Sequence, residues 1–295
     1  MAPSVSVILS FYNDLPLLRL VLDALAAQYE SQFEVLVADD GSQASVVNDL
    51  RQLLAAYPFA ATHLWHPDQG FRKTVILNRA VEQSRAPYLV FVDADCVPQD
   101  HFIDDHLRGS RLGLCQTGRR VNVAREAVTA LDCSEPNRIV TRNLVKLLGW
   151  SFSRRSQALE KGLRLPTAWV ETLERFAHLP ARGILGCNFS LCRQDLLAVN
   201  GFDERFATPW GAEDTDLERR LRISGLQFKT LRHQATMIHF DASFHQRGQA
   251  GPVGETDYYA LVASENWAFT PYGIRKEDGP GGSHATLNEY FVNNR

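Results

Sequence analysis

The stretch Tyr88-Leu-Val-Phe-Val-Asp-Ala-Asp95 decides the fold of this chain. Its apolar run is typical of a strand that is buried on both faces of a sheet. Asp93 and Asp95 follow at the carboxyl end, where open α/β sheets bind their ligands. Side chains two apart on an extended chain point the same way, so the two carboxylates should converge. Such a pair suits Mg²⁺ or Mn²⁺, although two solvated loop acids would give the same pattern.

The residues before this stretch predict further strands, each followed by a helix. The expected strands cover 5–9, 33–38, 62–65 and 88–92. The expected helices cover about 14–25, 44–56 and 73–83. Strands that alternate with helices in this way indicate βαβ units and a parallel sheet, so the predicted fold class is α/β.

The turn after the first strand is unlike that of a dinucleotide-binding fold, because Ser10-Phe-Tyr-Asn13 contains no glycine. The sequence also lacks the pattern G-x-x-x-x-G-K-S/T of a phosphate-binding loop. A divalent cation at Asp93 and Asp95 is then the natural way to neutralise the oxygens of a diphosphate.

From about residue 124 to 180 the sequence becomes helical and basic. Between Arg138 and Arg164 there are seven lysines and arginines against one acid, Glu160, interleaved with leucine, valine and tryptophan. Two interpretations stay open. We favour a helical insertion that packs on the α/β domain with its charges solvated; the alternative is a segment that lies on an anionic membrane surface.

The residues beyond 181 predict shorter elements. Gly183–Cys192 should form a strand that lines a pocket, and a helix should follow over 193–199. A later helix opens at Glu213 and Asp214, and strands are expected over 228–231 and 235–239. The polar, poorly periodic remainder to residue 295 predicts no architecture.

Composition restricts the class of protein. The 295 residues are 45% hydrophobic and 22% charged with a net charge of −3, which is ordinary for a globular protein and gives no basic field for nucleic acid. No apolar run approaches the roughly 20 residues of a spanning helix, and the amino terminus lacks the features of a signal peptide. Five cysteines without C-x-x-C spacing favour a reducing cytosol, so we expect a cytoplasmic protein. Cys96 is interpreted as a small strand-end residue rather than a nucleophile.

Several short motifs, in this order, resemble the inverting nucleotide-sugar glycosyltransferases of the GT-A fold, in particular glycosyltransferase family 2. The last of them also looks like the carboxy-terminal part of galactosyltransferases and chondroitin-type polymerases. The motifs are Val5-Ser-Val-Ile-Leu-Ser-Phe-Tyr-Asn13, Asp39-Asp-Gly-Ser42, Gly70-Phe-Arg-Lys73 with Asn78-Arg79, Asp93-Ala-Asp95, Gly186-Cys-Asn188 and Trp210-Gly-Ala-Glu-Asp214.

This resemblance implies a Rossmann-like GT-A mixed sheet flanked by helices, with a helical insertion. A single domain would then be divided into a nucleotide-sugar-binding half, the insertion, an acceptor and catalytic half and a carboxy-terminal extension. The corresponding ranges are 1–123, 124–180, 181–240 and 241–295.

The resemblance also implies which residues hold the donor. Asp40 would accept a hydrogen bond from the uracil ring, and the main chain at Ser10 and Phe11 would line the nucleotide. Arg72 and Lys73 would add donor contacts. Asn188 would hydrogen-bond sugar hydroxyls and Trp210 would stack on a sugar face.

By the same resemblance the metal would be held mainly by Asp95, while Asp93 would face the ribose or the waters of the metal. His239 is the expected third ligand, with His245 as the fallback. An imidazole next to carboxylates favours Mn²⁺ somewhat over Mg²⁺.

Inversion at a sugar carbon is one in-line displacement and needs one general base. Asp214 matches that base, and Glu213 would orient the acceptor. Both open a predicted helix, where the helix dipole favours ionised carboxylates; an ordinary acidic helix cap would give the same sequence.

The expected reaction moves a hexose or N-acetylhexosamine from a UDP-sugar to a glycan or lipid-linked acceptor. Residues 138–164 would allow peripheral association at the inner face of the cell membrane. A haloacid-dehalogenase-type phosphatase also uses Asp-x-Asp after a strand, but there the strand is usually the first of its domain. A catalytically inactive sugar-nucleotide or glycan-binding module of the same fold is the remaining alternative, and the intact acids argue against it.

Overall fold

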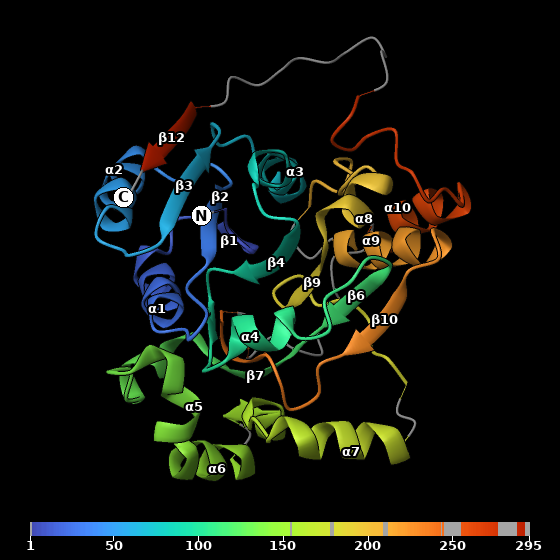
Figure 1. The fold of residues 1–295 in the computed structure, drawn as a ribbon. Helices are drawn as coiled ribbons and strands as arrows, with labels where there is room; N and C mark the ends of the chain where they lie inside the picture. The colour runs from blue at the N-terminus through green and yellow to red at the C-terminus, as the bar shows by residue number, and fades with distance from the viewer. Residues whose placement is uncertain are drawn as a thin grey trace.

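The computed structural model describes residues 2–153, 155–177, 180–208, 212–242, 244, 255–276 and 288–292. Its first 93 residues alternate strands and helices as predicted (Figure 1). The strands are β1 (Val5–Phe11), β2 (Phe33–Asp39), β3 (Ala60–Trp65) and β4 (Tyr88–Asp93). The helices are α1 (Leu15–Ala26), α2 (Ala44–Leu54) and α3 (Lys73–Gln83). The predicted α/β class is confirmed.

The larger sheet is mixed, and its strand order is β10-β6-β9-β4-β1-β2-β3-β12. The strands not yet introduced are β6 (Leu114–Thr117), β9 (Phe189–Cys192), β10 (Gln227–Thr230) and β12 (Asn288–Val292). β4 lies parallel to β1 on one side and antiparallel to β9 on the other. The strand that decides the fold therefore lies inside the sheet, as its unbroken apolar sequence predicts.

A smaller sheet has the order β5-β11-β7-β8. Its strands are β5 (Cys96–Pro98), β7 (Arg119–Ala124), β8 (Ser156–Gln157) and β11 (Thr236–Asp241). The register places His239 opposite Cys96 on one side and opposite Asn122 on the other. Because β5 starts three residues after β4 ends, the Asp93–Cys96 turn joins the two sheets.

The remaining described helices are shorter or lie in the insertion. They are α4 (Phe102–Leu107), η1 (Arg125–Ala130), η2 (Pro136–Arg138), α5 (Ile139–Arg142), α6 (Leu144–Phe152), η3 (Leu159–Gly162), α7 (Thr167–Ala177), α8 (Arg193–Ala198), α9 (Glu213–Ile223) and α10 (Glu255–Ser264). Figure 1 shows α5, α6 and α7 along one edge of the molecule, away from α2 and β12. Ile139, Val140 and Leu147 bury their side chains in the same apolar cluster as α1 and β1.

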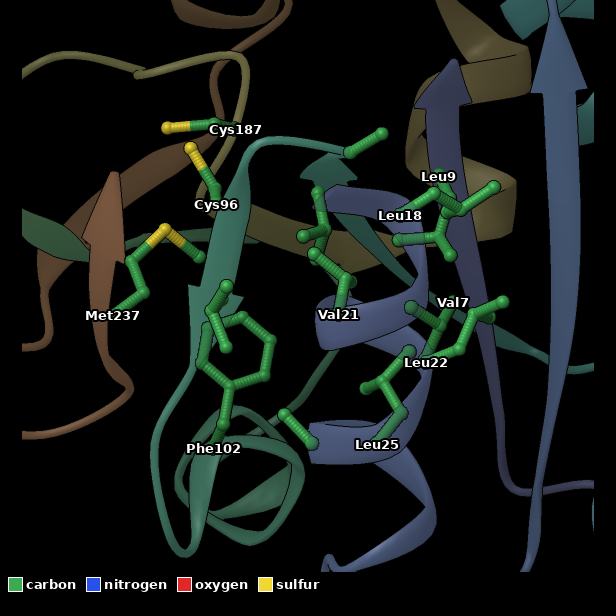
Figure 2. Close-up of a cluster of buried hydrophobic side chains, with 14 of the residues drawn as sticks. Val7, Leu9, Leu18, Val21, Leu22, Leu25, Cys96, Phe102, Cys187 and Met237 are labelled. Carbon is green, nitrogen blue, oxygen red and sulfur yellow. The ribbon is translucent and has the colours of Figure 1, made fainter. Parts of the chain in front are cut away.

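This apolar cluster extends from α1 to the Asp93–Cys96 turn. Leu18, Val21, Leu22 and Leu25 form one face of α1, as their helical spacing predicts, and they pack toward β1 (Figure 2). Each such buried side chain contributes roughly 1.5–3 kcal/mol of transfer free energy. Cys96 belongs to the same cluster, so the turn that carries the acids rests on a packed core.

Two segments differ from the prediction. Only Phe189–Cys192 of the predicted strand 183–192 pairs with other strands. Before it, the Ile184 and Gly186 N–H groups donate to carboxylates of α9 instead of a neighbouring strand. At the far end of the chain, β12 pairs antiparallel with β3 and α10 forms where the sequence predicted no element.

Candidate active site

The carboxyl ends of β1, β2 and β4 surround a cavity of about 500 Å³. Six of the residues expected to hold a donor or metal line it: Ser10, Phe11, Asp40, Lys73, Asp93 and Asp95. Further lining residues include Tyr12, Asp14, Asp68, Phe71, Arg125 and Phe240. The sheet edge that the Asp-x-Asp sequence indicated therefore carries a ligand-sized hollow.

Asp93 is held by groups of the larger sheet and α3. It lies opposite Ser10 in the β1–β4 register, and the Ser10 hydroxyl donates to Asp93 Oδ1. Lys73 Nζ donates to the same oxygen at 2.9 Å. Burial alone would raise the pKa of Asp93, but the Lys73 charge and the Ser10 hydrogen bond bring that pKa below its usual value. Burial opposes the charge of Lys73, yet Asp93, Asp214 and Glu213 together raise the Lys73 pKa. Both groups are thus ionised.

Asp40 is fixed on the other side of the cavity. The Arg72 N–H donates to its two oxygens at 3.2 and 3.0 Å, and His66 Nε2 lies 2.8 Å from Oδ1. The neighbouring Asp39 is fully buried and shapes the turn by accepting from the Ser42 N–H at 2.8 Å. Arg72 orients Asp40 through its main chain, whereas its guanidinium donates to Gln69.

Asp95 faces His239 across the turn between the sheets, with Asp95 Oδ2 and His239 Nε2 3.2 Å apart. His239 Nδ1 lies 3.1 Å from Asn122 Oδ1. The Asn122 amide oxygen and the Asp95 carboxylate can both only accept, so a neutral imidazole with one N–H can donate to only one of them. Two electron-rich atoms this close fit a cation, and an outer hydrogen bond of this kind orients metal-binding histidines. His245 lies outside the described residues.

Asp214 and Glu213 open α9. Asp214 Oδ2 accepts from the Gly186 N–H at 2.7 Å, and a Cβ at Gly186 would lie 2.6 Å from each Asp214 oxygen. Burial raises the pKa of Asp214 against the opposing charge of Lys73. Burial and the neighbouring Asp214 raise the pKa of Glu213 to about 7. Glu213 Oε2 is buried and has no hydrogen-bond partner in the part of the chain that the structure describes.

Asn188 lies away from the cavity. It is fully buried; its amide donates to the carbonyl oxygens of Arg119 and Ala235 at 3.1 and 2.9 Å, and its oxygen lies 3.0 Å from His106 Nε2. These hydrogen bonds link Asn188 to β7 and to the residue before β11, so its amide is occupied by main-chain partners and does not face the cavity. Trp210 lies outside the described residues.

Two groups at the site were missed from the sequence. Arg120 Nη1 lies 2.8 Å from Cys187 Sγ, and its charge also acts on Asp93 and Asp214. A hydrogen bond from Cys96, together with Arg120, lowers the pKa of Cys187 to about 7 despite burial. Cys187 is 67 positions from Arg120, and nothing in the sequence indicated that these two side chains meet.

Asp14 and Arg125 form a second unpredicted feature. Both line the cavity, and Arg125 Nε lies 2.9 Å from Asp14 Oδ2. The ion pair joins the N-cap of α1 to η1, which follows β7, at the cavity wall.

Two family models match the chain. Residues 6–109 match the model described as glycosyl transferase family 2, and residues 172–245 match that described as the N-terminal domain of galactosyltransferase. The first range contains Asp40, Asp93 and Asp95, and the second contains Asp214 and His239. Among the described residues, no helix combines the length and the apolar character needed to cross a bilayer.

Curated relatives agree with these matches. Validoxylamine A glucosyltransferase of Streptomyces hygroscopicus subsp. jinggangensis is 29% identical over 291 residues, covering 92% of this chain and 65% of its own length. Chondroitin synthase of Escherichia coli is 23% identical over 286 residues, covering 92% of this chain and 39% of its own. The chain therefore spans less than two thirds of both relatives.

Solved structures agree on the fold. The mannosyltransferase PcManGT from Pyrobaculum calidifontis, in complex with GDP-Man and Mn²⁺, has a TM-score of 0.52 at 16% identity, covering 91% of this chain and 70% of its own. TarS of S. aureus has a TM-score of 0.51 at 17% identity, covering 90% of this chain and 39% of its own. The chain thus has the GT-A fold of these glycosyltransferases.

Proposed function

We propose that this chain transfers a hexose or N-acetylhexosamine from a UDP-sugar to a glycan or lipid-linked acceptor, with inversion at the transferred carbon. One observation carries the proposal. The Lys73 ammonium that donates to Asp93 is also close enough to Asp214 and Glu213 to have its pKa raised by them. Asp93, expected on the donor side, and Asp214 and Glu213, expected on the acceptor side, therefore all act on the charge of Lys73.

On the donor side, Asp40 would accept from the uracil ring, because its oxygens are held in place at the cavity wall. Asp95 and His239 would hold the cation, with Asn122 orienting the imidazole. A bound Mn²⁺ or Mg²⁺ supplies positive charge against the diphosphate. Lys73 and Arg120 would add fixed positive charge near the group that leaves.

On the acceptor side, Asp214 would act as the general base. The Gly186 N–H engages Oδ2, which leaves Oδ1 to take the proton of the acceptor hydroxyl. The acceptor oxygen then bonds to the sugar carbon, while the bond to the diphosphate breaks and its electron pair leaves with the nucleotide. The raised pKa of Asp214 makes it a stronger base than an exposed aspartate. The unpartnered Glu213 Oε2 would accept a hydrogen bond from the acceptor.

The direct test is Asp214→Asn, with transfer measured against a panel of UDP-sugars in the presence of Mn²⁺. A lost general base lowers kcat by about 10²–10⁴-fold. Asp195→Asn is the matched control, because Asp195 also lies in the first turn of a helix and accepts from a glycine N–H, that of Gly113, at 2.9 Å. Parent-like transfer by Asp214→Asn would refute the mechanism. If the parent chain binds UDP but neither transfers the sugar nor hydrolyses the donor, the result would favour the alternative that the chain is a catalytically inactive binding module.

The insertion supports a peripheral membrane association, through apolar contacts rather than net charge. Acids outside 138–164 neutralise three of its arginines: Arg138 pairs with Asp100, Arg142 with Asp132 and Arg164 with Asp105. On its inner side, Ile139, Val140 and Leu147 pack into the apolar cluster of α1 and β1.

The outer side of the insertion is apolar. Val145, Leu148 and Phe152 form one stripe of α6 and are 85%, 46% and 90% exposed. A similar stripe on α7 consists of Trp169, Leu173 and Phe176. Outward apolar stripes of this kind are typical of helices that lie in a membrane interface, and we propose that α6 and α7 rest on one.

A further inference from the structure

Sheet register brings a thiol to the expected cation position. Cys96 of β5 lies directly opposite His239 of β11, which lies directly opposite Asn122 of β7. Residues directly opposite each other in paired strands present their side chains on the same face. Cys96 also follows Asp95 in the chain, so carboxylate, thiol and imidazole meet at one point.

Both distances from the Asp95 carboxylate are close to those between the ligand atoms of a tetrahedral metal site. Asp95 Oδ1 lies 3.3 Å from Cys96 Sγ, and Asp95 Oδ2 lies 3.2 Å from His239 Nε2. Ligand atoms of all three residues lie within 4.8 Å of one another. Zinc bonds of about 2.0–2.3 Å in a tetrahedron separate the ligand atoms by about 3.3–3.8 Å. Little movement is needed to close the three groups on an ion.

We propose that Asp95, Cys96 and His239 form a mixed site that binds Zn²⁺ in competition with Mn²⁺. The proposal rests on the proposed function for the role of the harder cation at this position. Thiolate and imidazole ligands favour zinc, and zinc also ranks above manganese in general affinity. Zinc replaces the proton of the Cys96 thiol, and that proton leaves to solvent; no electron is transferred.

A second thiol lies next to the site. Cys187 Sγ, Cys96 Sγ and an Asp93 oxygen also lie within 4.8 Å of one another. Figure 2 shows the sulfur atoms of Cys96 and Cys187 close together. Arg120 Nη1 lies 2.8 Å from Cys187 Sγ and supplies positive charge there, which disfavours a cation on the Cys187 side. Cys96 is therefore the thiol assigned to zinc.

Zinc at this position should inhibit sugar transfer. A tetrahedral ion with three protein ligands has one position left for a donor oxygen. An octahedral Mn²⁺ on Asp95 and His239 keeps several positions, enough for both phosphates. Zinc would therefore occupy the site but could bind only one donor oxygen, whereas Mn²⁺ could bind oxygens of both phosphates.

The test uses Co²⁺ as a coloured substitute for zinc on the full chain. We expect a thiolate-to-cobalt charge-transfer band in the near ultraviolet, which added Zn²⁺ abolishes. Cys96→Ser should lose the band and weaken zinc binding by more than about tenfold. Mutating a residue that only hydrogen-bonds to a metal ligand already costs about 10–100-fold in affinity, and Cys96 would be a ligand itself. Cys133→Ser is the control, because this half-buried thiol lies near Val128 O in the insertion.

Three outcomes would overturn the proposal: no thiolate band in the parent, an unchanged band in Cys96→Ser, or loss of the band in Cys187→Ser alone. If Cys96→Ser does not fold, calorimetry of the parent in two buffers of different ionisation enthalpy decides, since zinc must release a proton. The two proposals fail separately. Metal-dependent transfer without a thiolate band refutes the zinc site only, and a thiolate band without transfer refutes the proposed function only.

Discussion

Gly186→Ala should displace Asp214, the proposed general base, while leaving the Asp214 side chain itself unmutated. The added Cβ would lie 2.6 Å from both oxygens of Asp214, whereas ordinary contacts begin near 3.4 Å, so the carboxylate must move by about 0.8 Å. The same movement breaks the 2.7 Å hydrogen bond from the residue 186 N–H to Asp214 Oδ2. A misplacement of about 1 Å in a catalytic group costs about 10²-fold in rate. We therefore expect kcat to fall about 100-fold, or about 2.7 kcal/mol.

The assay is steady-state transfer from the preferred UDP-sugar, with a thermal melt to confirm folding. Gly149→Ala is the matched control, because a Cβ there meets no atom within 4 Å and the residue lies inside α6. An alanine in a helix is about 1 kcal/mol more favourable than a glycine, so this control should keep its kcat and gain stability.

A double-mutant cycle shows whether the effect passes through the base. If Gly186→Ala acts only by moving Asp214, it should add almost nothing to Asp214→Asn, since residues that act as a unit are not additive. Full additivity, or a Gly186→Ala enzyme with the parent kcat, would refute the assigned role of the contact.

Three further predictions follow from the same geometry. The pKa of Glu213 is raised from 4.5 to about 7, so between these pH values the folded state keeps Glu213 protonated while the unfolded state loses the proton. The stability of the protein should therefore fall as the pH rises from about 4.5 to 7. Thermal melts at several pH values should show a smaller fall for Glu213→Gln. Asp95→Asn should weaken Mn²⁺ binding, followed by electron paramagnetic resonance of free Mn²⁺, more than Asp93→Asn does, because the charge of Asp93 is already offset by a lysine. Val145→Ser with Phe152→Ser should lower co-sedimentation with lipid vesicles several-fold, and added salt should change that binding little, since the contact is apolar.

The sequence predicted those parts of the fold and site that depend on local pattern. The apolar run ending at Asp93 and the helix spacing of α1 each depend on a few consecutive residues, and both elements form where expected. Ser10 and Asp93 are 83 positions apart, but both stand at strand ends of a parallel sheet, so their meeting also follows from strand order.

Contacts set by pairing in the smaller sheet could not be predicted in the same way. Cys96 looked like a small strand-end residue because the register that sets it against His239 depends on β11, more than 140 residues later. Asn188 looked like a sugar ligand because its partners are main-chain carbonyls, which leave no signal in the sequence. The strand expected over 183–192 is short for a related reason: side chains of α9, not another strand, take the N–H groups before it.

The two acids of the Asp-x-Asp sequence have different surroundings, because Asp93 contacts residues of the larger sheet and α3 whereas Asp95 faces the smaller sheet. Asp93 ends β4, and the Ser10 hydroxyl and the Lys73 ammonium already satisfy one of its oxygens. Asp95 lies in the turn just before β5, where its Oδ2 faces the His239 imidazole of the smaller sheet, 3.2 Å from Nε2. Asp93 therefore has the Lys73 ammonium as its countercharge, whereas Asp95 faces an imidazole, where the proposed ion would supply positive charge. In the proposed mechanism the cation would therefore lie beside β11, and Lys73, which contacts Asp93 and feels the charge of Asp214, would lie between the donor and the general base.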